Sequence, residues 1–463
     1  MSTATLPMEW HGRSGRVYSP AGKGRVRHGS LSSVRKVVGV GDGSGTSDVE
    51  AGVPLALKQW REGDEASLDR LQQEARTLVE LAARHREQPD SDLPCPRLYD
   101  LVGDPLVTGV ITEWCPLDLE RWWRDKLQQP EAFGRLCAVL AEAAKRINDY
   151  QRDFAGKGGL DIAHGDVKPT NVLMNAEGRW VVSDFGCAPV RAPADDVWAE
   201  SRVVVATDNF LAPEVLFQAR RPHPAAVDTW SLAASFFALL KLRRMVLDGS
   251  ALPHNGTASP RFRMERVARI MEVYGRDPQR FEERDLEPEA FADPLRIPDE
   301  DRQAVRDALR GVFGEAVDPE DAEDRLAEDV VTLLDRALSI DPAHRFTDAR
   351  DVSAAFEGLT RSFLALSAHV ESATRNMDPD ELVAALENER VRNDVLRQRL
   401  GHLEAQLAVP VVAPSNPAVQ VPLWMTSLLL SSVALQGLTL VAVALLWVLW
   451  ATSGGPGTAA AGL

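Results

Sequence analysis

Residues 164–171 read HGDVKPTN, and this short stretch carries three complementary side chains. The carboxylate of Asp166 can accept the proton of a hydroxyl group, and the amide oxygen of Asn171 can hold a magnesium ion. Lys168, between them, can neutralise charge on a moving phosphoryl group. Because phosphoryl transfer is catalysed mainly by positioned charges and metal ions, the stretch predicts a phosphoryl-transfer site.

A second motif, Asp184-Phe185-Gly186, follows a short apolar run that is typical of a β-strand. An Asp at a strand end, followed by Phe-Gly, suits a metal ligand on a hinged turn. Together the two motifs resemble the catalytic loop and the metal-binding motif of the protein kinase family. The resemblance implies that Asp166 and Lys168 are catalytic, and that Asn171 and Asp184 bind Mg²⁺ or Mn²⁺.

The resemblance extends upstream to residues that would position ATP. Leu55-Ala56-Leu57-Lys58 resembles the strand whose Lys contacts the α- and β-phosphates. Glu74 lies among apolar residues at helical spacing, and the resemblance implies that it pairs with Lys58. Taken alone, either residue would be a solvated surface charge, so the assignment depends on the ordered set of motifs.

The adenine end of the ATP site is implied by the residues between the two expected lobes. Thr112 resembles the residue at the back of the adenine pocket, and Glu113 and Cys115 would offer backbone hydrogen bonds to the base. Ala56 and Val34 are assigned to the same site.

The loop that would cover the phosphates departs most from the family pattern. The family's loop is followed by a valine and a second strand, an order that residues 27–34 (RHGSLSSV) fit, with Val34 as the valine and residues 35–38 as the strand. In this alignment Gly29 is the one glycine kept at the three glycine positions. The glycine-rich run within residues 39–52 is then a long hairpin loop.

Downstream motifs continue in the family's order. Ala212-Pro213-Glu214 resembles the end of an activation segment, and Thr207 is implied to lie near the catalytic carboxylate. Thr207 and Lys168 favour Ser and Thr over Tyr as acceptors. Asp228 resembles the start of the buried helix of the large lobe, and Arg345 resembles the Arg that pairs with Glu214.

Two further departures concern regulation and length. Gly165 stands where many kinases have an Arg, which implies less dependence on a phosphorylated activation segment. Residues 243–329 are acidic, exceed what a minimal kinase needs, and are expected to contain extra helices of unknown role. The simplest interpretation of this insert is an elaboration of the surface.

The predicted fold class is α+β, with the bilobal architecture of protein kinases. A β-rich small lobe is expected over about residues 16–113 and a helical large lobe over about 116–366, with ATP and magnesium between them. Residues 1–15 are expected to be disordered. The predicted function is that of a serine/threonine protein kinase with protein substrates.

Two alternatives remain open. The partial loss of loop glycines would suit a catalytically weak pseudokinase scaffold, although Lys58, Asp166, Asn171 and Asp184 oppose it. Small-molecule phosphotransferases also often read His-Gly-Asp, but they usually lack the Ala-Pro-Glu motif and the later Arg.

The C-terminal part of the chain predicts a membrane anchor. No charged side chain follows Glu404, and Leu423–Trp450 is an uncharged run of 28 residues, longer than the roughly 20 needed to cross a bilayer. The alternative is a buried core helix. A proline-rich linker over 408–422 and a short non-cytoplasmic tail over 451–463 flank this predicted transmembrane helix. Basic residues before the span predict a cytoplasmic kinase domain at the cell membrane.

A helical segment over 378–407 precedes the linker. Six leucines between residues 382 and 407 fall on one alternating four–three spacing, with Glu389 and Asn393 at the two remaining positions. This spacing is typical of a short coiled coil and suggests a parallel homodimer. The alternative is one amphipathic helix that packs back on the large lobe.

Composition excludes other classes of function. The formal net charge is −16, from 52 basic and 68 acidic residues, and an acidic chain is a poor match for nucleic acid, whose phosphates require clustered Lys and Arg. The four cysteines are scattered, without the paired spacing of a zinc site.

Overall fold

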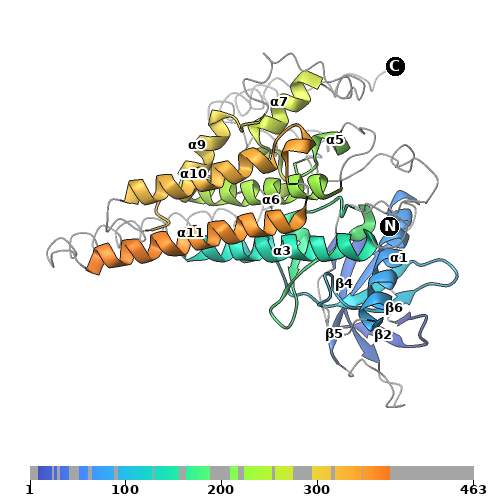
Figure 1. The fold of residues 1–463 in the computed structure, drawn as a ribbon. Helices are drawn as coiled ribbons and strands as arrows, with labels where there is room; N and C mark the ends of the chain where they lie inside the picture. Colours follow the sequence, from blue (N-terminus) through green and yellow to red (C-terminus); the bar gives the residue numbers. More distant parts are fainter. Residues whose placement is uncertain are drawn as a thin grey trace, which may run out of the picture. The chain divides into compact units, whose positions relative to one another are not determined.

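The computed structural model describes residues 9–375 with short gaps, at 23–25, 29–31, 41–51, 61–64, 88–91, 128, 130, 156–162, 188–208, 217–223, 253–255, 275–294, 314–318 and 347. Within this part of the chain a β-rich lobe is followed by a largely helical lobe, as the sequence predicts (Figure 1).

The described residues of the small lobe form a seven-stranded antiparallel sheet. Its strands are β1 Trp10–His11, β2 Val17–Pro20, β3 Arg27–His28, β4 Ser32–Val40, β5 Pro54–Trp60, β6 Leu98–Val102 and β7 Gly109–Glu113. Their order is β1-β2-β4-β5-β7-β6, with β3 pairing with β4. Beyond β1, Gly12 bridges Val102 of β6, and the N–H of Arg13 donates to the carbonyl of Leu101 at 2.8 Å. The two edges therefore meet, and the sheet closes as a small barrel.

The start of the lobe corrects a sequence-based boundary. The prediction of disorder over residues 1–15 is wrong for residues 10–12, because Trp10–His11 form β1 and Gly12 bridges Val102. The buried carboxylate of Asp100 accepts hydrogen bonds from the Tyr18 hydroxyl at 2.9 Å and from the Ser14 N–H at 3.2 Å. A two-residue strand shows no periodicity, and the bond from Ser14 to Asp100 joins residues 86 positions apart, so no local pattern indicates this start of the lobe.

Strand β4 is also longer than predicted. The sequence predicts a strand over 35–38 and a loop from residue 39, but β4 continues to Val40. Gly39 and Val40 remain in the ladder because they pair with Tyr18 and Val17 of β2. The rest of the predicted hairpin loop, at residues 41–51, lies outside the described residues.

Alternation along β5 separates the core from the cleft. Leu55 and Leu57 are fully buried inside the barrel, so Ala56 and Lys58 face the other side of the sheet. Helix α1 (Glu65–Glu87) covers that side and buries Leu71, Ala75, Leu78 and Leu81. Glu74 lies on the same helical face, one turn from these apolar residues.

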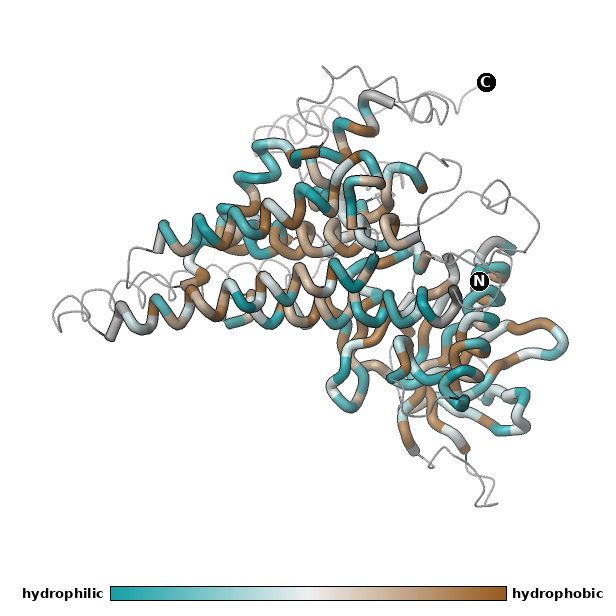
Figure 2. Tube along the Cα trace, viewed as in Figure 1, coloured by the Kyte–Doolittle hydropathy of each residue, from teal (hydrophilic) through white to brown (hydrophobic). Residues whose placement is uncertain are grey.

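The large lobe is built mainly from helices. They are α2 Leu119–Arg124, α3 Ala132–Ala155, α5 Pro213–Leu216, α6 Pro224–Leu247, α7 Glu265–Tyr274, α9 Asp299–Leu309, α10 Pro319–Ala337 and α11 Ala349–Arg375. Figure 1 shows α11 running beside α3, with α6 and α10 next to this pair. In Figure 2, α10 and α11 alternate between hydrophilic and hydrophobic residues, as expected for helices that bury one stripe.

Short elements complete the lobe and carry the sequence motifs. A second sheet contains β8 Leu117–Asp118, β9 Val172–Met174 and β10 Trp180–Val182. Five 3₁₀ helices are described, η1 Pro169–Asn171, η2 Phe185–Cys187, η3 Gly256–Ala258, η4 Pro260–Phe262 and η5 Pro342–His344. Helices α7, α9 and the start of α10 lie in the acidic insert, so its predicted extra helices are present.

Helix α6 is apolar for a structural reason. Among the described residues it is the one helix, over Ala225–Leu247, that is long and apolar enough to cross a membrane, yet 94% of its most apolar window is buried in the lobe. It is therefore the core helix of the large lobe. The predicted coiled coil (378–407), linker (408–422), transmembrane helix (423–450) and tail (451–463) lie outside the described residues, and nothing in the structure tests them.

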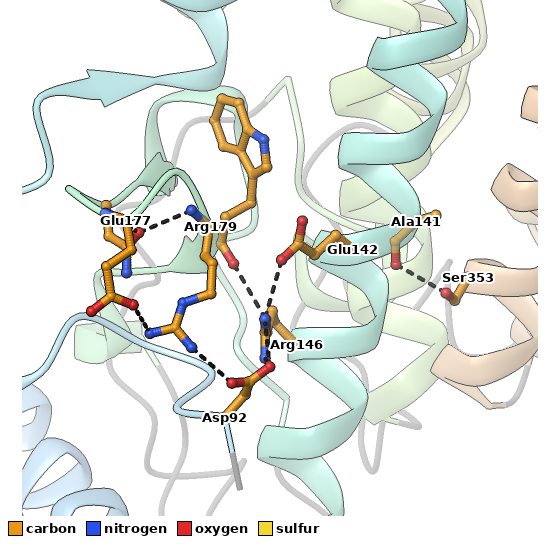
Figure 3. Close-up of polar contacts among 9 residues, drawn as sticks. Asp92, Ala141, Glu142, Arg146, Glu177, Arg179 and Ser353 are labelled. Atoms are coloured by element: carbon orange, nitrogen blue, oxygen red, sulfur yellow. Dashed lines mark hydrogen bonds and ion pairs between the residues drawn. The ribbon is translucent and has the colours of Figure 1, made fainter.

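A polar cluster joins the connection between α1 and β6 to the large lobe (Figure 3). The Asp92 carboxylate lies 3.3 Å from the guanidinium of Arg146 on α3 and 2.7 Å from that of Arg179, just before β10. The N–H of Val182 donates to the carbonyl of Pro94 at 2.9 Å. Burial would raise the pKa of Asp92, but the two guanidinium groups lower it below its ordinary value. The connection is thus fixed beside the strand that leads to Asp184.

Candidate active site

The catalytic-loop residues predicted from sequence lie together between α3 and β9. The ammonium group of Lys168 lies 2.7 Å from Oδ2 of Asp166. The Asn171 side chain donates to the carbonyl of Asp166 at 2.8 Å and to its Oδ2 at 3.2 Å. Burial raises the pKa of the Asp166 carboxyl, and Lys168 opposes that rise. These contacts hold the Asp166 carboxylate through one of its oxygens, Oδ2.

Asp228, at the start of α6, fixes the backbone of this loop. Its carboxylate accepts hydrogen bonds from the N–H of His164 at 2.7 Å and of Gly165 at 3.0 Å. It also accepts one from the Gln151 side chain at 2.8 Å. The sequence predicts that Asp228 begins the core helix, but it does not predict these contacts, because they join residues more than 60 positions apart.

Gly165 has a conformational role beyond the absence of an Arg side chain. Its φ is +79°, in the left-handed region that glycine adopts without strain. The N–H groups of Gly165 itself and of His164 before it donate to Asp228, which holds the backbone in this conformation. A side chain at position 165 would therefore be strained in the loop as it is folded here.

Asp184 follows β10 with a φ of +71°, a strained conformation for a residue with a side chain. The Phe185 ring is buried, with its centre 4.9 Å from that of Tyr150 and 4.7 Å from that of His164. The His164 ring is hydrogen-bonded to the carbonyl of Ser183 at 3.0 Å. These contacts hold the motif in place and turn the Asp184 carboxylate toward the small lobe.

Lys58 joins the two lobes. Its ammonium group lies 2.6 Å from the Glu74 carboxylate and 2.8 Å from the Asp184 carboxylate. Burial alone would lower the pKa of Lys58, but the two carboxylates raise it well above its ordinary value. For Asp184 burial would raise the pKa, but Lys58 holds it well below the usual range. An ammonium has three N–H donors, and the third can serve a phosphate oxygen.

The donor set fits a hard divalent cation. Asn171 and Asp184 offer amide and carboxylate oxygens, the ligands that Mg²⁺ takes together with water and phosphate oxygens. Within the described ranges no cluster of three His, Cys, Asp or Glu side chains is placed to hold a metal. A site with one carboxylate and one amide suits a cation that arrives with nucleotide phosphates rather than a structural metal.

The residues assigned to adenine lie around the hinge between the lobes. Ala56 of β5 pairs with Thr112 of β7, and Glu113 ends β7. Burial raises the pKa of the half-buried Cys115 thiol to about 12, so this thiol is not an activated nucleophile.

The alignment of the phosphate-covering loop agrees with the strand pairing. Val34 of β4 lies opposite Lys58 of β5 and opposite Arg27 of β3, so β3 and β4 pair as antiparallel strands. Gly29, between these strands in the sequence, lies outside the described residues, as does Thr207.

A buried ion pair fixes the end of the activation segment. The Arg345 guanidinium lies 2.6 and 2.9 Å from the two carboxylate oxygens of Glu214 on α5. It also donates to the carbonyl groups of Ser339, Ala226 and Ile340, and it stacks 4.7 Å from the centre of the Trp230 ring. The predicted pairing of Glu214 with Arg345 is present.

Comparison with known proteins identifies the family of this arrangement. The model of the protein kinase domain matches residues 97–357, which is 261 of the 463 residues. The match contains the catalytic loop, Asp184, Glu214 and Arg345. It begins after Lys58 and Glu74, whose placement is seen in the structure.

Individual relatives match shorter parts of the chain. Serine/threonine-protein kinase TOS3 of Saccharomyces cerevisiae is 27% identical over 153 residues, 31% of this chain and 27% of that protein. Serine/threonine-protein kinase SSN3 of Mycosarcoma maydis is 34% identical over 115 residues, 25% of this chain and 16% of that protein. Serine/threonine-protein kinase KIN28 of Saccharomyces cerevisiae is 34% identical over 143 residues, 30% of this chain and 42% of that protein. This chain therefore spans less than half of each relative.

Proposed function

Since this chain belongs to the protein kinase family, we propose that it is a membrane-anchored serine/threonine protein kinase that transfers the γ-phosphoryl group of ATP to protein hydroxyls. The contact of Lys58 with both Glu74 and Asp184 carries the proposal. It brings a phosphate-binding cation and a metal ligand into one site from two lobes. Relatives named serine/threonine kinases support the choice of acceptor.

Each residue has a defined task in the proposed reaction. The Lys58 ammonium binds the phosphates and is held by Glu74. Asp166 Oδ1 accepts the proton as the acceptor oxygen bonds to phosphorus and the bond to the ADP oxygen breaks. Lys168 balances negative charge on the moving group. A divalent cation held by Asn171 and Asp184 would neutralise the phosphate oxygens.

Asp166→Asn tests the proposal directly. With labelled ATP and a generic protein acceptor, the wild-type chain should label Ser and Thr, and Asp166→Asn should lower the rate by about 10²- to 10⁴-fold, because the proton acceptor is lost. Asp248→Asn is the matched control, since Asp248 is 56% exposed at the end of α6 and pairs with Arg244. A wild-type chain without transfer would favour the pseudokinase scaffold, and labelling of small molecules alone would favour the phosphotransferase.

We further propose that residues 423–450 anchor the kinase domain on the cytoplasmic side of the cell membrane, and that residues 382–407 pair two chains. The uncharged span, the arginines before it and the leucine spacing support this. The full chain should sediment with membranes and resist extraction by high salt. A chain ending at Val409 should stay in the supernatant and sediment as a dimer in analytical ultracentrifugation.

Variants separate the two parts of this prediction. Leu396→Asp with Leu403→Asp should convert the shortened chain to a monomer, because charges in a coiled-coil seam oppose pairing. A full chain released from membranes by high salt would refute the anchor. A shortened chain that stays monomeric at high micromolar concentration would refute the dimer.

A further inference from the structure

The acidic insert contacts helix α2 through a buried polar cluster. At η3 the Thr257 hydroxyl donates to the Glu120 carboxylate at 2.6 Å, and the Thr257 N–H donates to the same oxygen at 3.2 Å. Both residues are buried, Thr257 almost completely. Gly256 has a φ of +57°, and a Cβ atom there would lie 1.7 Å from Glu120. The close approach therefore requires a glycine next to Thr257.

The same few residues also hold the end of the activation segment. The buried side chain of Asn209 donates to the carbonyl groups of Ser259 at 2.7 Å and Thr257 at 3.3 Å. Its amide oxygen accepts a hydrogen bond from Nε of Arg263 at 3.4 Å. The amide nitrogen and the amide oxygen of Asn209 are thus both hydrogen-bonded to one segment, Gly256–Arg263, which we name the brace.

The position of Asn209 gives the brace a function. Asn209 lies two residues after Thr207, which the kinase resemblance places beside the catalytic carboxylate, and five residues before Glu214. Arg345 fixes the segment at Glu214. The brace fixes it again at Asn209, nearer to where the acceptor protein binds. At its start, the brace is hydrogen-bonded through Thr257 to Glu120 of α2, the helix that follows directly after the hinge.

We infer that the brace positions the protein-binding end of the activation segment, with Glu120, Thr257 and Asn209 as positioning residues for the protein acceptor. This inference rests on the proposed kinase function. It gives the first part of the insert a role in acceptor binding, whereas α9, later in the insert, packs on α6, and α7 packs on α9.

Kinetics of isosteric variants test the brace in the full chain. Thr257→Val removes the hydroxyl and Asn209→Asp removes both N–H donors, so the segment loses its fixed position. Each variant should raise the KM for a generic protein acceptor by about tenfold or more and change the KM for ATP less than about twofold. Thr257→Ser keeps the hydroxyl and should restore the wild-type KM for the acceptor.

Two control variants remove contacts that do not involve the brace. Arg269→Ala removes an exposed contact between α7 and Glu300 in the same insert. Ser353→Ala removes a buried hydrogen bond of 2.9 Å to the Ala141 carbonyl, visible in Figure 3. Neither should change the KM for the acceptor, and a circular dichroism melt checks the folding of all variants. An equal rise of both KM values, or a wild-type acceptor KM in both brace variants, would overturn the inference.

Hydrogen–deuterium exchange provides a readout that needs no activity. The backbone amides of residues 209–216 should exchange faster in Thr257→Val and in Asn209→Asp than in the wild type, and at the wild-type rate in Arg269→Ala. If the wild-type chain transfers no phosphoryl group, the proposed kinase function fails, while this measurement still decides whether the brace holds the segment. Unchanged exchange in both brace variants would overturn the inference.

Discussion

Replacing Lys58 by Met is expected to reduce phosphoryl transfer at least about a hundredfold, the effect typical of removing one preorganised charged group from an active site. The Met side chain has a similar length but cannot bind phosphate oxygens. It also leaves the buried Glu74 carboxylate and the partly exposed Asp184 carboxylate without the cation that lies 2.6 and 2.8 Å away. The rate of transfer to a protein acceptor at saturating ATP measures the effect.

Two variants make this experiment specific to the site. Lys145→Met removes an exposed Lys from α3 and should leave the rate near that of the wild type. Glu74→Gln keeps Lys58 but removes one of its two partners, and it should give an intermediate rate. If Lys58→Met kept more than about a tenth of the wild-type rate, the assignment of β5 as the phosphate-binding strand would be wrong.

Replacing Arg345 by Met is expected to cost about 3–5 kcal/mol in the free energy of unfolding, because it leaves the buried Glu214 carboxylate without its partner. The side chain of Arg345 is fully buried and that of Glu214 is 4% exposed, so water cannot replace the lost contacts. Several main-chain carbonyls also lose a donor. Urea unfolding of the full chain in mild detergent, followed by tryptophan fluorescence, measures the change.

The matched control is an exposed pair on the same lobe. The side chain of Arg350 is 75% exposed beside Asp348, and Arg350→Met should leave the free energy of unfolding close to that of the wild type. Arg345→Lys keeps the charge but not the two-pronged contact with Glu214, so it should fall between these values. Equal effects of Arg345→Met and Arg350→Met would show that the buried pair adds nothing to stability.

Residues that act through local chemistry could be predicted from the sequence. The roles of the stretch 164–171 and of the Asp184 motif follow from neighbouring residue types, and apolar spacing placed Glu74 on a helix, although only the family resemblance implied that it pairs with Lys58. The pairing of Glu214 with Arg345 likewise depended on the resemblance, since its residues are 131 positions apart.

Contacts between distant residues without a family motif could not be predicted. The bonds from Asp228 to the catalytic loop, and from Thr257 to Glu120 over 137 positions, leave no periodicity in the chain. The positive φ of Gly165 could not be predicted either, because the sequence shows which residue is present but not the conformation that it adopts. The small lobe was predicted to start at residue 16, but it starts with β1. This strand depends on its pairing with β2, and the adjoining residues Ser14 and Tyr18 are bound by Asp100, so the two residues of β1 alone give no signal.

The closure of the barrel also determines when the small lobe can complete its folding during synthesis. Gly12 and Arg13 leave the ribosome early, but their partners Val102 and Leu101 follow only about 90 residues later. At a synthesis rate of roughly 5–20 residues per second, the first strand waits on the order of 5–20 seconds for the edge that it joins. During this interval the nascent small lobe is an open sheet with unpaired edges, which is the state in which strands pair with the wrong neighbours. Slow translation before residue 102 would lengthen that exposure.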